Sequence, residues 1–241
     1  MTESKNIYGS FSVPSTLNIE NVTISVYREN EFTYYQRDLS GTTNKKYVFT
    51  CDDSHFTINP VEPQNVPKKL TSHMLIELEN PLLVGSGTKK TIYITFPVEI
   101  GIFFHTTRGK ELIDVFSLNI KKFTLYGNPN DGIICKYYKS SVYPKPPEVN
   151  SMKEGVLEVE VVNNNGNTVE VRNIVFSAYG MKIFYDDKTV SMKAILRTVS
   201  RKVAETDFLN DPIHHGMVKS PEIYVPGKMH YTTKYIMDKG L

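Results

Sequence analysis

The sequence predicts an all-β fold, built as two tandem antiparallel β-sandwich (immunoglobulin-like) units with little helix. The first observation is composition: alanine, the best helix former, occurs three times in 241 residues. The strand-favouring residues Val, Ile, Thr, Tyr and Phe occur 23, 19, 21, 15 and 12 times. The second is repeated apolar–polar alternation, and the third is the regular spacing of turns between about a dozen short strands. We therefore expect less than about a fifth of the residues to be helical.

Three segments alternate with a period of two residues: Asn21–Arg28, His73–Glu79 and Lys90–Val98. Alternation of this kind is typical of half-buried antiparallel strands, because successive side chains point to opposite faces. The second and third segments are joined by Asn80–Gly87, which we interpret as a turn-rich connector because its glycines can adopt a positive φ.

The clearest predicted hairpin joins Val156–Val162 to Thr168–Phe176 through Asn163–Asn167. Asn and Gly tolerate the left-handed backbone that tight hairpins require. The expected register places Val161 opposite Val169. Its buried face then holds four valines: Val159, Val161, Val169 and Val171.

A second hairpin is expected over Lys121–Tyr138, because Gly127–Gly132 is dense in turn formers. The proline-rich stretches Asn59–Pro67 and Tyr143–Pro147 are expected to be loops or edges, since proline cannot donate to a central ladder. Lys188–Glu205 fits both a helical and a strand period, and we expect a strand in its first half.

A break near residue 110 predicts two domains, residues 1–110 and 111–241, each resembling a β-sandwich. No run of about 20 apolar residues predicts a membrane helix, and no apolar block near the N-terminus predicts a secretory signal. The cysteines Cys51 and Cys135 have neither disulfide-framework nor metal-site spacing. These features predict a cytoplasmic protein.

No P-loop, nucleophile elbow or dinucleotide fingerprint is present, so we predict no catalytic residue and no cofactor. Glu62, Glu99 and Asp114 lie beside strand ends, but a glycosidase pair must stand about 5 to 9.5 Å apart, which a sequence does not reveal. The Cys51–His55 cluster and the pair His214–His215 are expected to be polar loops and turns rather than metal sites.

The stretch from Lys121 to Lys145 interleaves lysines with aromatic residues, a pattern that can stack on bases or sugars and neutralise phosphates. The alternative is ordinary cross-strand packing with solubilising lysines. A formal net charge of +2 argues against a nucleic-acid partner. The candidate binding residues of this stretch are Lys122, Tyr126, Lys136, Tyr137 and Tyr138.

A second candidate surface is a basic strip, in which no acidic residue interrupts the chain between Lys188 and Ala204. Its residues are Lys188, Lys193, Arg197, Arg201 and Lys202. Lys193, Arg197 and Arg201 are spaced four residues apart, which places them on one face of either a helix or a strand. The strip could hold an acidic partner, or it could be a solvated face balanced by acids such as Glu158, Glu160 and Glu170.

The sequence resembles an archaeal family of uncharacterised proteins, a domain of unknown function. The resemblance rests on nine short motifs: Tyr8–Phe11, Asn59–Pro63, Phe96–Gly101, Asp114–Ser117, Thr124–Gly127, Glu154–Gly155, Val169–Arg172, Ala178–Ile183 and Val203–Thr206. It implies an archaeal protein without an established activity. It also implies a membrane-associated partner, because relatives are often encoded near genes for small mechanosensitive channels.

The sequence therefore predicts a non-catalytic binding or interaction module with a protein or membrane-associated partner. The alternatives are a carbohydrate- or nucleic-acid-binding module and an undetected hydrolase. A cleft lined by convergent acids would favour the hydrolase, whereas a flat exposed aromatic strand face would favour the ligand-binding module. A large exposed apolar patch would favour a protein partner.

Overall fold

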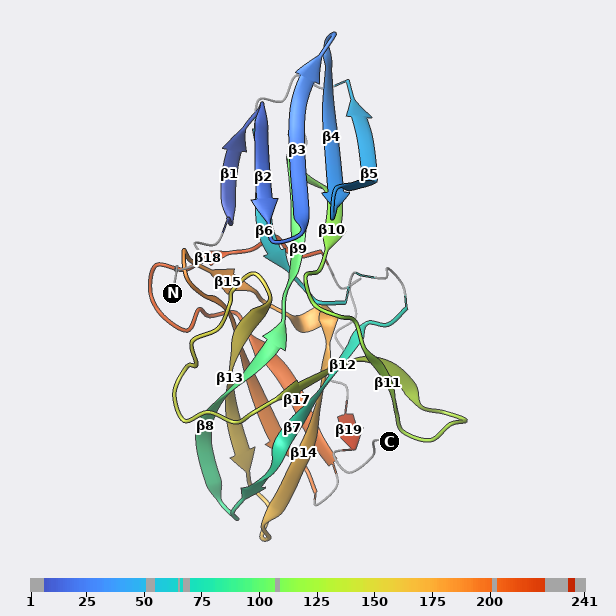
Figure 1. Ribbon diagram of the computed structural model, residues 1–241. Coiled ribbons are helices and arrows are strands. Elements are labelled where there is room, and N and C mark those ends of the chain that lie inside the picture. Colours follow the sequence, from blue (N-terminus) through green and yellow to red (C-terminus); the bar gives the residue numbers. More distant parts are fainter. Residues whose placement is uncertain are drawn as a thin grey trace. The chain divides into compact units, whose positions relative to one another are not determined.

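The computed structural model describes residues 7–50, 55–64, 66, 70–106, 109–200, 203–223 and 234–236 (Figure 1). Across these residues the only helical element is a 3₁₀ turn, Ala178–Gly180, and every other regular element is a β-strand. The predicted all-β chain with little helix is confirmed. The described residues contain no helix that is long and apolar enough to cross a membrane.

The chain forms two compact units, here called the larger unit and the smaller unit. The larger unit contains Pro60–Ile100 and Phe116–Leu241, and the smaller unit contains Ile7–Asn59 and Gly101–Val115. The units are interleaved along the sequence, whereas the division expected at residue 110 is linear. The chain leaves the smaller unit after residue 59 and returns to it at residue 101.

The strands of the smaller unit are β1 (Gly9–Ser12), β2 (Ser15–Ile19), β3 (Val22–Glu29), β4 (Phe32–Leu39), β5 (Thr42–Phe49) and most of β6 (His55–Val61), β9 (Glu99–Thr106) and β10 (Gly109–Phe116). They pair in two sheets, β1-β6-β9-β10 and β2-β3-β4-β5. Asn30 and Glu31 connect β3 to β4 with φ of 48° and 69°, the backbone that suits a two-residue hairpin turn. The predicted strand at Asn21–Arg28 is confirmed as β3, with its valines and Ile24 buried.

The strands of the larger unit are β7 (His73–Val84), β8 (Thr88–Pro97), β11 (Phe123–Tyr126), β12 (Ile133–Ser140), β13 (Glu154–Asn163), β14 (Val169–Ser177), β15 (Phe184–Tyr185), β16 (Val190–Thr198), β17 (Val203–Leu209), β18 (Val218–Lys219) and β19 (Lys234–Ile236). They form a sheet of order β11-β12-β7-β14, here called the β7 sheet, and a second sheet, called the β13 sheet. In the β13 sheet the order is β18-β15-β16-β13-β8, and β17 also pairs with β16 and β19.

Hydrogen bonds join the β7 sheet to the β13 sheet along both sides of the larger unit. The backbone N–H of Thr95 in β8 donates to Ser140 Oγ in β12 at 2.8 Å. The hydroxyl of Thr206 in β17 donates to the carbonyl of Val175 in β14, also at 2.8 Å. The apolar faces between these bonds form the core, and residues such as Ile76 and Ile94 are fully buried there.

The hairpin predicted over residues 156–176 is wrong. β13 pairs antiparallel with β8 and parallel with β16, whereas β14 pairs with β7 in the other sheet. Val159, for instance, lies opposite Ile92 and Ala194 rather than Val171. The four valines are nevertheless buried as expected. The apolar–polar alternation therefore predicted correctly which side chains of β13 and β14 are buried. The predicted pairing of these two strands with each other was wrong.

A buried asparagine, Asn163, lies where the chain crosses between the sheets. The side-chain amide of Asn163 donates to the carbonyls of Val84, Gly85 and Asn167, each at 2.9 Å. Its Oδ1 accepts from the backbone N–H of Asn165 at 3.0 Å and from the hydroxyl of Thr198 at 2.8 Å. The hydrogen bonds of Asn163 thus link the β7–β8 connection to the β13–β14 connection. It supplies the polar groups that a buried crossing requires.

Other strand predictions are confirmed, with one change of direction. β11 and β12 form the antiparallel hairpin expected over Lys121–Tyr138. The ambiguous Lys188–Glu205 segment contains β16 and enters β17, so its first half is a strand as expected. The sheets are not purely antiparallel, however, because β12 runs parallel to β7 and β13 runs parallel to β16.

Candidate functional site

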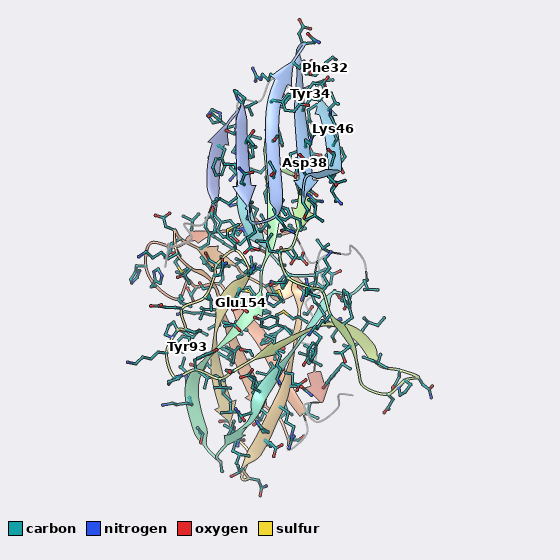
Figure 2. The ribbon with its side chains drawn as sticks, viewed as in Figure 1. Phe32, Tyr34, Asp38, Lys46, Tyr93 and Glu154 are labelled. Atoms are coloured by element: carbon teal, nitrogen blue, oxygen red, sulfur yellow. The ribbon has the colours of Figure 1, made fainter. Side chains whose placement is uncertain are left out.

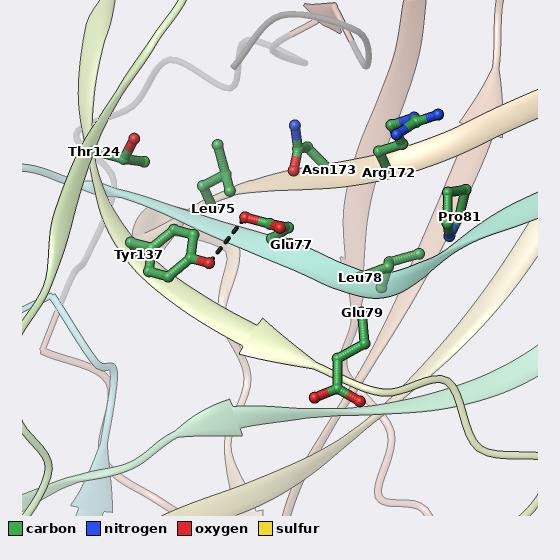
Figure 3. A pocket seen from close by; sticks show the side chains of 9 residues that line it. All are labelled: Leu75, Glu77, Leu78, Glu79, Pro81, Thr124, Tyr137, Arg172 and Asn173. Atoms are coloured by element: carbon green, nitrogen blue, oxygen red, sulfur yellow. Dashed lines mark hydrogen bonds between the residues drawn. The ribbon is translucent and has the colours of Figure 1, made fainter. Parts of the chain in front are cut away.

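A pocket of about 230 Å³ opens on the outer face of the β7 sheet in the larger unit (Figure 3). β7 crosses it, and β11, β12 and β14 supply its walls. Its lining residues are Leu75, Glu77, Leu78, Glu79, Pro81, Thr124, Tyr137, Arg172 and Asn173. Of these, only Tyr137 belongs to the surfaces that the sequence predicted.

Strand alternation and register bring these residues together. Met74 and Ile76 of β7 point into the core, so the alternate residues Leu75 and Glu77 face the other side of the sheet. Parallel pairing sets Tyr137 of β12 beside Leu75, and antiparallel pairing sets Asn173 of β14 beside Glu77. Three segments that are distant in sequence therefore meet at one place.

An irregularity between β7 and β14 helps to shape the pocket. Val171 lies opposite Leu82 and Asn173 lies opposite Glu77, so four residues of β7 face the single residue Arg172. Pro81 falls within these four residues, where its missing N–H removes no ladder hydrogen bond. Bulges of this kind redirect side chains, and they are frequent at binding sites.

The polar groups of the pocket include two carboxylates, Glu77 and Glu79, and one cation, Arg172. The hydroxyl of Tyr137 donates to Glu77 Oε2 at 2.8 Å, and Ser141 donates to Glu79. Burial, followed by the hydrogen bond and charge of Glu77, raises the pKa of the Tyr137 hydroxyl. Arg172 is paired with Glu170, which does not line the pocket. Within the described residues, neither Glu77 nor Glu79 pairs with a cation, so the pocket is negatively charged.

Beside the carboxylates lies a small apolar cluster of Leu75, Tyr126, Cys135 and Val175. Leu75 is 2% exposed and Cys135 is fully buried, and the ring of Tyr137 packs against the cluster. Burial raises the pKa of the Cys135 thiol to about 12, which keeps it neutral and unreactive. The pocket therefore combines an apolar floor with anionic walls.

The residues of the aromatic-basic stretch do not lie on one face. Lys136 is 3% exposed and pairs with Glu99, and its ammonium also donates to the carbonyl of Pro63. Tyr138 donates to Glu154 on the opposite face of β12 from Tyr137. Tyr126 is buried in the apolar cluster, whereas Lys122 is exposed. Only Tyr137 reaches the pocket.

Two residues of the basic strip, Lys193 and Arg197, lie on β16 of the β13 sheet, among acidic residues. Lys193 pairs with Glu158 at 3.3 Å, and exposed Arg197 lies opposite Glu205 in the register of β16 and β17. Lys188 is exposed in the turn before β16. The last two predicted residues, Arg201 and Lys202, lie outside the described residues.

The three acids considered as glycosidase candidates are all buried, with Glu62 and Asp114 2% exposed and Glu99 fully buried. Glu62 accepts from the backbone N–H of Ile223 at 2.9 Å, Glu99 pairs with Lys136, and Asp114 accepts three side-chain donors. The carboxylates of these three residues therefore bind groups inside the protein.

The residues proposed as polar turns show no metal site in the described part of the chain. His214 Nε2 lies 3.0 Å from Asp186 Oδ2, and no group of three or more ligating side chains occurs among the described residues. The cluster Cys51–His55 lies outside the described residues except for His55.

The sequence contained one signal for the pocket. Leu75, Glu77 and Glu79 are alternate residues of a strand, so two carboxylates share a face with a leucine. Thr124 and Asn173 carried no such signal, because their place beside β7 depends on pairing between distant strands.

Comparison with known proteins gives a family but no activity. No curated protein and no solved structure matches the chain. A family model described as "Protein of unknown function (DUF432)" matches residues 7–238, which is nearly the whole chain. The chain therefore belongs to the DUF432 family of proteins of unknown function.

Proposed function

We propose that this protein is a non-catalytic binding module, and that the pocket on the β7 sheet holds a basic side chain presented by a protein partner. The observation that carries the proposal is the pair Glu77 and Glu79, which have no cationic partner among the described residues and stand beside an apolar floor. Lysine and arginine have the matching shape, an apolar stem with a charged head.

The size of the pocket supports a side chain rather than a larger ligand. A volume of about 230 Å³ lies below the roughly 300 to 1,000 Å³ of sites that hold drug-sized molecules. A carboxylate hydrogen-bonded to a basic head group forms a charge-assisted contact, which is about twice as strong as a neutral one. Glu77 accepts one hydroxyl in the free protein, and a carboxylate has room for further donors.

The arrangement favours binding over hydrolysis. Figure 3 shows Glu77 turned toward Tyr137, whereas Glu79 extends the other way, so the two carboxylates do not converge on one bond. The pKa values of Tyr137 and Cys135 are raised, which moves both groups away from the range that suits a base or nucleophile near neutral pH. Because the two carboxylates are separated, they suit a segment of the partner that carries more than one basic residue.

The test uses synthetic decapeptides as probes: one rich in lysine and arginine, one rich in glutamate, and one of glycine and serine. We expect the basic peptide alone to bind in calorimetry and to shift the NMR signals of Tyr137. Glu77→Gln with Glu79→Gln should weaken that binding by about tenfold, since a hydrogen bond to a charged group contributes about 1.5–3 kcal/mol.

The control is Glu160→Gln, which removes a carboxylate that pairs with Lys89 on the β13 sheet. It should leave peptide binding unchanged. The proposal is overturned if acidic and basic peptides bind alike, or if the double variant and the Glu160→Gln control lose the same affinity.

A second candidate function is carbohydrate binding, and an exposed aromatic face of the smaller unit favours it. The rings of Tyr27 and Tyr34 stack 5.1 Å apart at 7° on the β2-β3-β4-β5 sheet, and the Lys46 ammonium lies 5.4 Å from the Tyr34 ring centroid. The amide of Gln36 donates to Asp38 farther along β4. Figure 2 shows Phe32, Tyr34, Asp38 and Lys46 on this sheet.

Sugars present apolar CH faces to aromatic rings and hydroxyl groups to polar side chains, and this sheet offers both kinds of contact. The test is electrophoresis through gels containing soluble dextran, mannan or xylan. Binding should retard the protein, and Tyr34→Ala should abolish the retardation while the exposed-aromatic control Tyr179→Ala preserves it. Equal migration with and without every polysaccharide would remove this candidate.

A further inference from the structure

The hairpin of β11 and β12 exposes an apolar face in the larger unit. Leu125 lies directly opposite Ile134 in this hairpin, so side-chain alternation places Phe123, Leu125 and Ile134 on one face of it. Phe123 is 37% exposed and Ile134 is 46% exposed, whereas Leu125 is half-buried. Thr124, which lines the pocket on the β7 sheet, points to the opposite face. The apolar face is therefore separate from the pocket.

This apolar face continues the buried side of the β7 sheet. Lys136 and Met74 lie on the same side of the sheet, where Lys136 is 3% exposed and Met74 is fully buried. Ile134 comes only two residues before Lys136 and is nearly half exposed. The cover over this side of the sheet thus ends between the two residues. In Figure 1 the turn of the hairpin extends beyond the strands of the larger unit.

Ile120, which precedes β11, is 88% exposed, more than any other large apolar side chain in the described part of the chain. The backbone is held on both sides of it. The side-chain amide of Asn119 donates to the carbonyl of Lys153 at 2.6 Å. The carbonyl of Lys122 accepts from the backbone N–H of Tyr137 at 2.8 Å. The exposure of Ile120 is therefore set by the fold.

Two lysines adjoin these apolar side chains. Lys121 and Lys122 follow Ile120 directly, and both are exposed. Neither of them forms an ion pair with any residue that the structure describes. Asp131, in the turn of the hairpin, is the only acidic residue between positions 115 and 147 of the chain. The exposed apolar side chains are thus accompanied by positive charge.

We propose that this surface docks on an anionic lipid membrane. The residues of this surface, here called the hairpin surface, are Ile120, Lys121, Lys122, Phe123 and Ile134. The three apolar side chains enter the interfacial layer of the membrane, and the two lysines contact lipid phosphates. Aromatic and aliphatic side chains beside lysines are typical of segments that bind at this layer, where apolar burial and attraction to anionic lipids add together.

Charge and shape favour a lipid surface over other occupants. A second copy of the chain would bring its own Lys121 and Lys122 toward those of the first, and like charges repel. A protein groove would have to match the projecting Ile120, whereas the lipid interface deforms around a projecting side chain. The hairpin surface is independent of the proposed pocket, which attracts the opposite charge.

The first test uses fluorescence of the full-length protein. Because the chain contains no tryptophan, Phe123→Trp places a single reporter in the hairpin surface. We expect its emission to shift to shorter wavelength with vesicles that contain phosphatidylcholine and anionic phosphatidylglycerol, and to shift much less with phosphatidylcholine alone. The control is Leu83→Trp, because Leu83 is 68% exposed near the other end of β7. Its emission should stay unchanged.

The second test measures sedimentation of the protein with the same anionic vesicles. Lys121→Gln combined with Lys122→Gln should weaken binding by about tenfold, since lysines near an anionic membrane surface contribute to binding. Ile120→Ser leaves every charge in place and should also weaken binding, because it removes apolar contact. The matched control is Lys89→Gln combined with Lys90→Gln, which removes two exposed neighbouring charges from β8. It should bind about as well as the unaltered protein.

The proposal is overturned if the two double-lysine variants lose the same affinity, or if Leu83→Trp shifts as much as Phe123→Trp. Emission of Phe123→Trp that stays the same with every vesicle would also overturn it, and would indicate a protein partner for the hairpin surface.

Discussion

Gly155 of β13 is required because the ring of Phe96 occupies the space above it. Gly155 lies opposite Phe96 in the pairing of β13 with β8. A Cβ atom added to Gly155 would stand 2.3 Å from Phe96 Cζ, far inside van der Waals contact. Phe96 is fully buried in the core, so its ring has little freedom to move aside.

We therefore expect Gly155→Ala to lower the free energy of unfolding by about 1–3 kcal/mol, as overpacking of a core does. Urea unfolding followed by circular dichroism measures the effect. Gly166→Ala is the control, because a Cβ there meets no atom within 4 Å. If both substitutions change the unfolding midpoint equally, the close contact at Gly155 has no energetic weight.

Lys136 shows why the type of a residue does not by itself predict whether its side chain is exposed. A lysine between exposed-looking aromatics is expected at the surface, since lysine is rarely buried unless it is paired. Its partner Glu99 lies 37 residues earlier in the chain, and no local pattern reveals their contact. The sequence thus showed the residue types of the stretch but not which of them reach solvent.

The buried pair gives a second prediction. Lys136→Met leaves Glu99 without its cation in the core, and it should cost about 3–5 kcal/mol of stability in urea unfolding. Adding Glu99→Leu removes the stranded charge and should recover much of that loss. A double variant that is no more stable than Lys136→Met would show that the pair itself, rather than the uncompensated charge, sets the effect.

For individual strands, the apolar–polar alternation predicted which side chains are buried, but it did not predict which strands pair with each other. The valines of β13 and β14 face the core as expected, because side-chain direction is a local property of an extended chain. Pairing depends on contacts across distant segments, and β13 prefers β8 and β16 over its neighbour in sequence. The residues Asn163–Asn167 suit a tight hairpin turn equally well, so the turn signal could not tell a hairpin from a crossing between sheets.

We expect Asn163 to stabilise the crossing between the sheets, and its removal tests this. Asn163→Ala removes the donor to the buried carbonyl of Val84 and to the partly buried carbonyl of Gly85. We expect a loss of about 3 kcal/mol, since each unsatisfied buried polar group costs about 1–3 kcal/mol. Thermal unfolding measures it, with exposed Asn164→Ala as the silent control. Similar melting temperatures for the two variants would contradict this role.

At the scale of the whole molecule, composition predicted the fold class while the pocket remained hidden. Alanine is scarce and β-branched residues are abundant along the whole chain. The all-β class therefore follows from the strand preferences of all residues added together. The pocket depends instead on the mutual register of β7, β11, β12 and β14 and on one bulge. These are long-range consequences of packing that residue-by-residue patterns do not encode.

Several tyrosines link the stability of the whole molecule to alkaline pH. Burial raises the pKa of Tyr35, Tyr93, Tyr137 and Tyr138 above the ordinary value of 10.0. The folded protein then holds these protons more tightly than the unfolded chain. The resulting stabilisation is complete below pH 10 and is lost as the pH rises above it.

We therefore expect tyrosinate absorbance to rise in two stages. Tyr35 and Tyr138, whose hydroxyls are the most buried of the four, should ionise only in the second stage, in a cooperative step that coincides with loss of the near-ultraviolet circular dichroism signal. A single, non-cooperative titration of all tyrosines near pH 10, with the dichroism signal retained, would contradict the burial of these hydroxyls.

The interleaving of the two units has a consequence for synthesis on the ribosome. Residues 7–59 emerge before the other segment of the smaller unit, Gly101–Val115, which follows about forty residues later. At about 5–20 residues per second, the nascent chain waits some seconds with the edge of β6 lacking its neighbour β9. The meander β2-β3-β4-β5 has only local pairings and can form during this delay. Codon usage across residues 60–100 therefore sets how long an incomplete sheet is exposed to other chains in the cell.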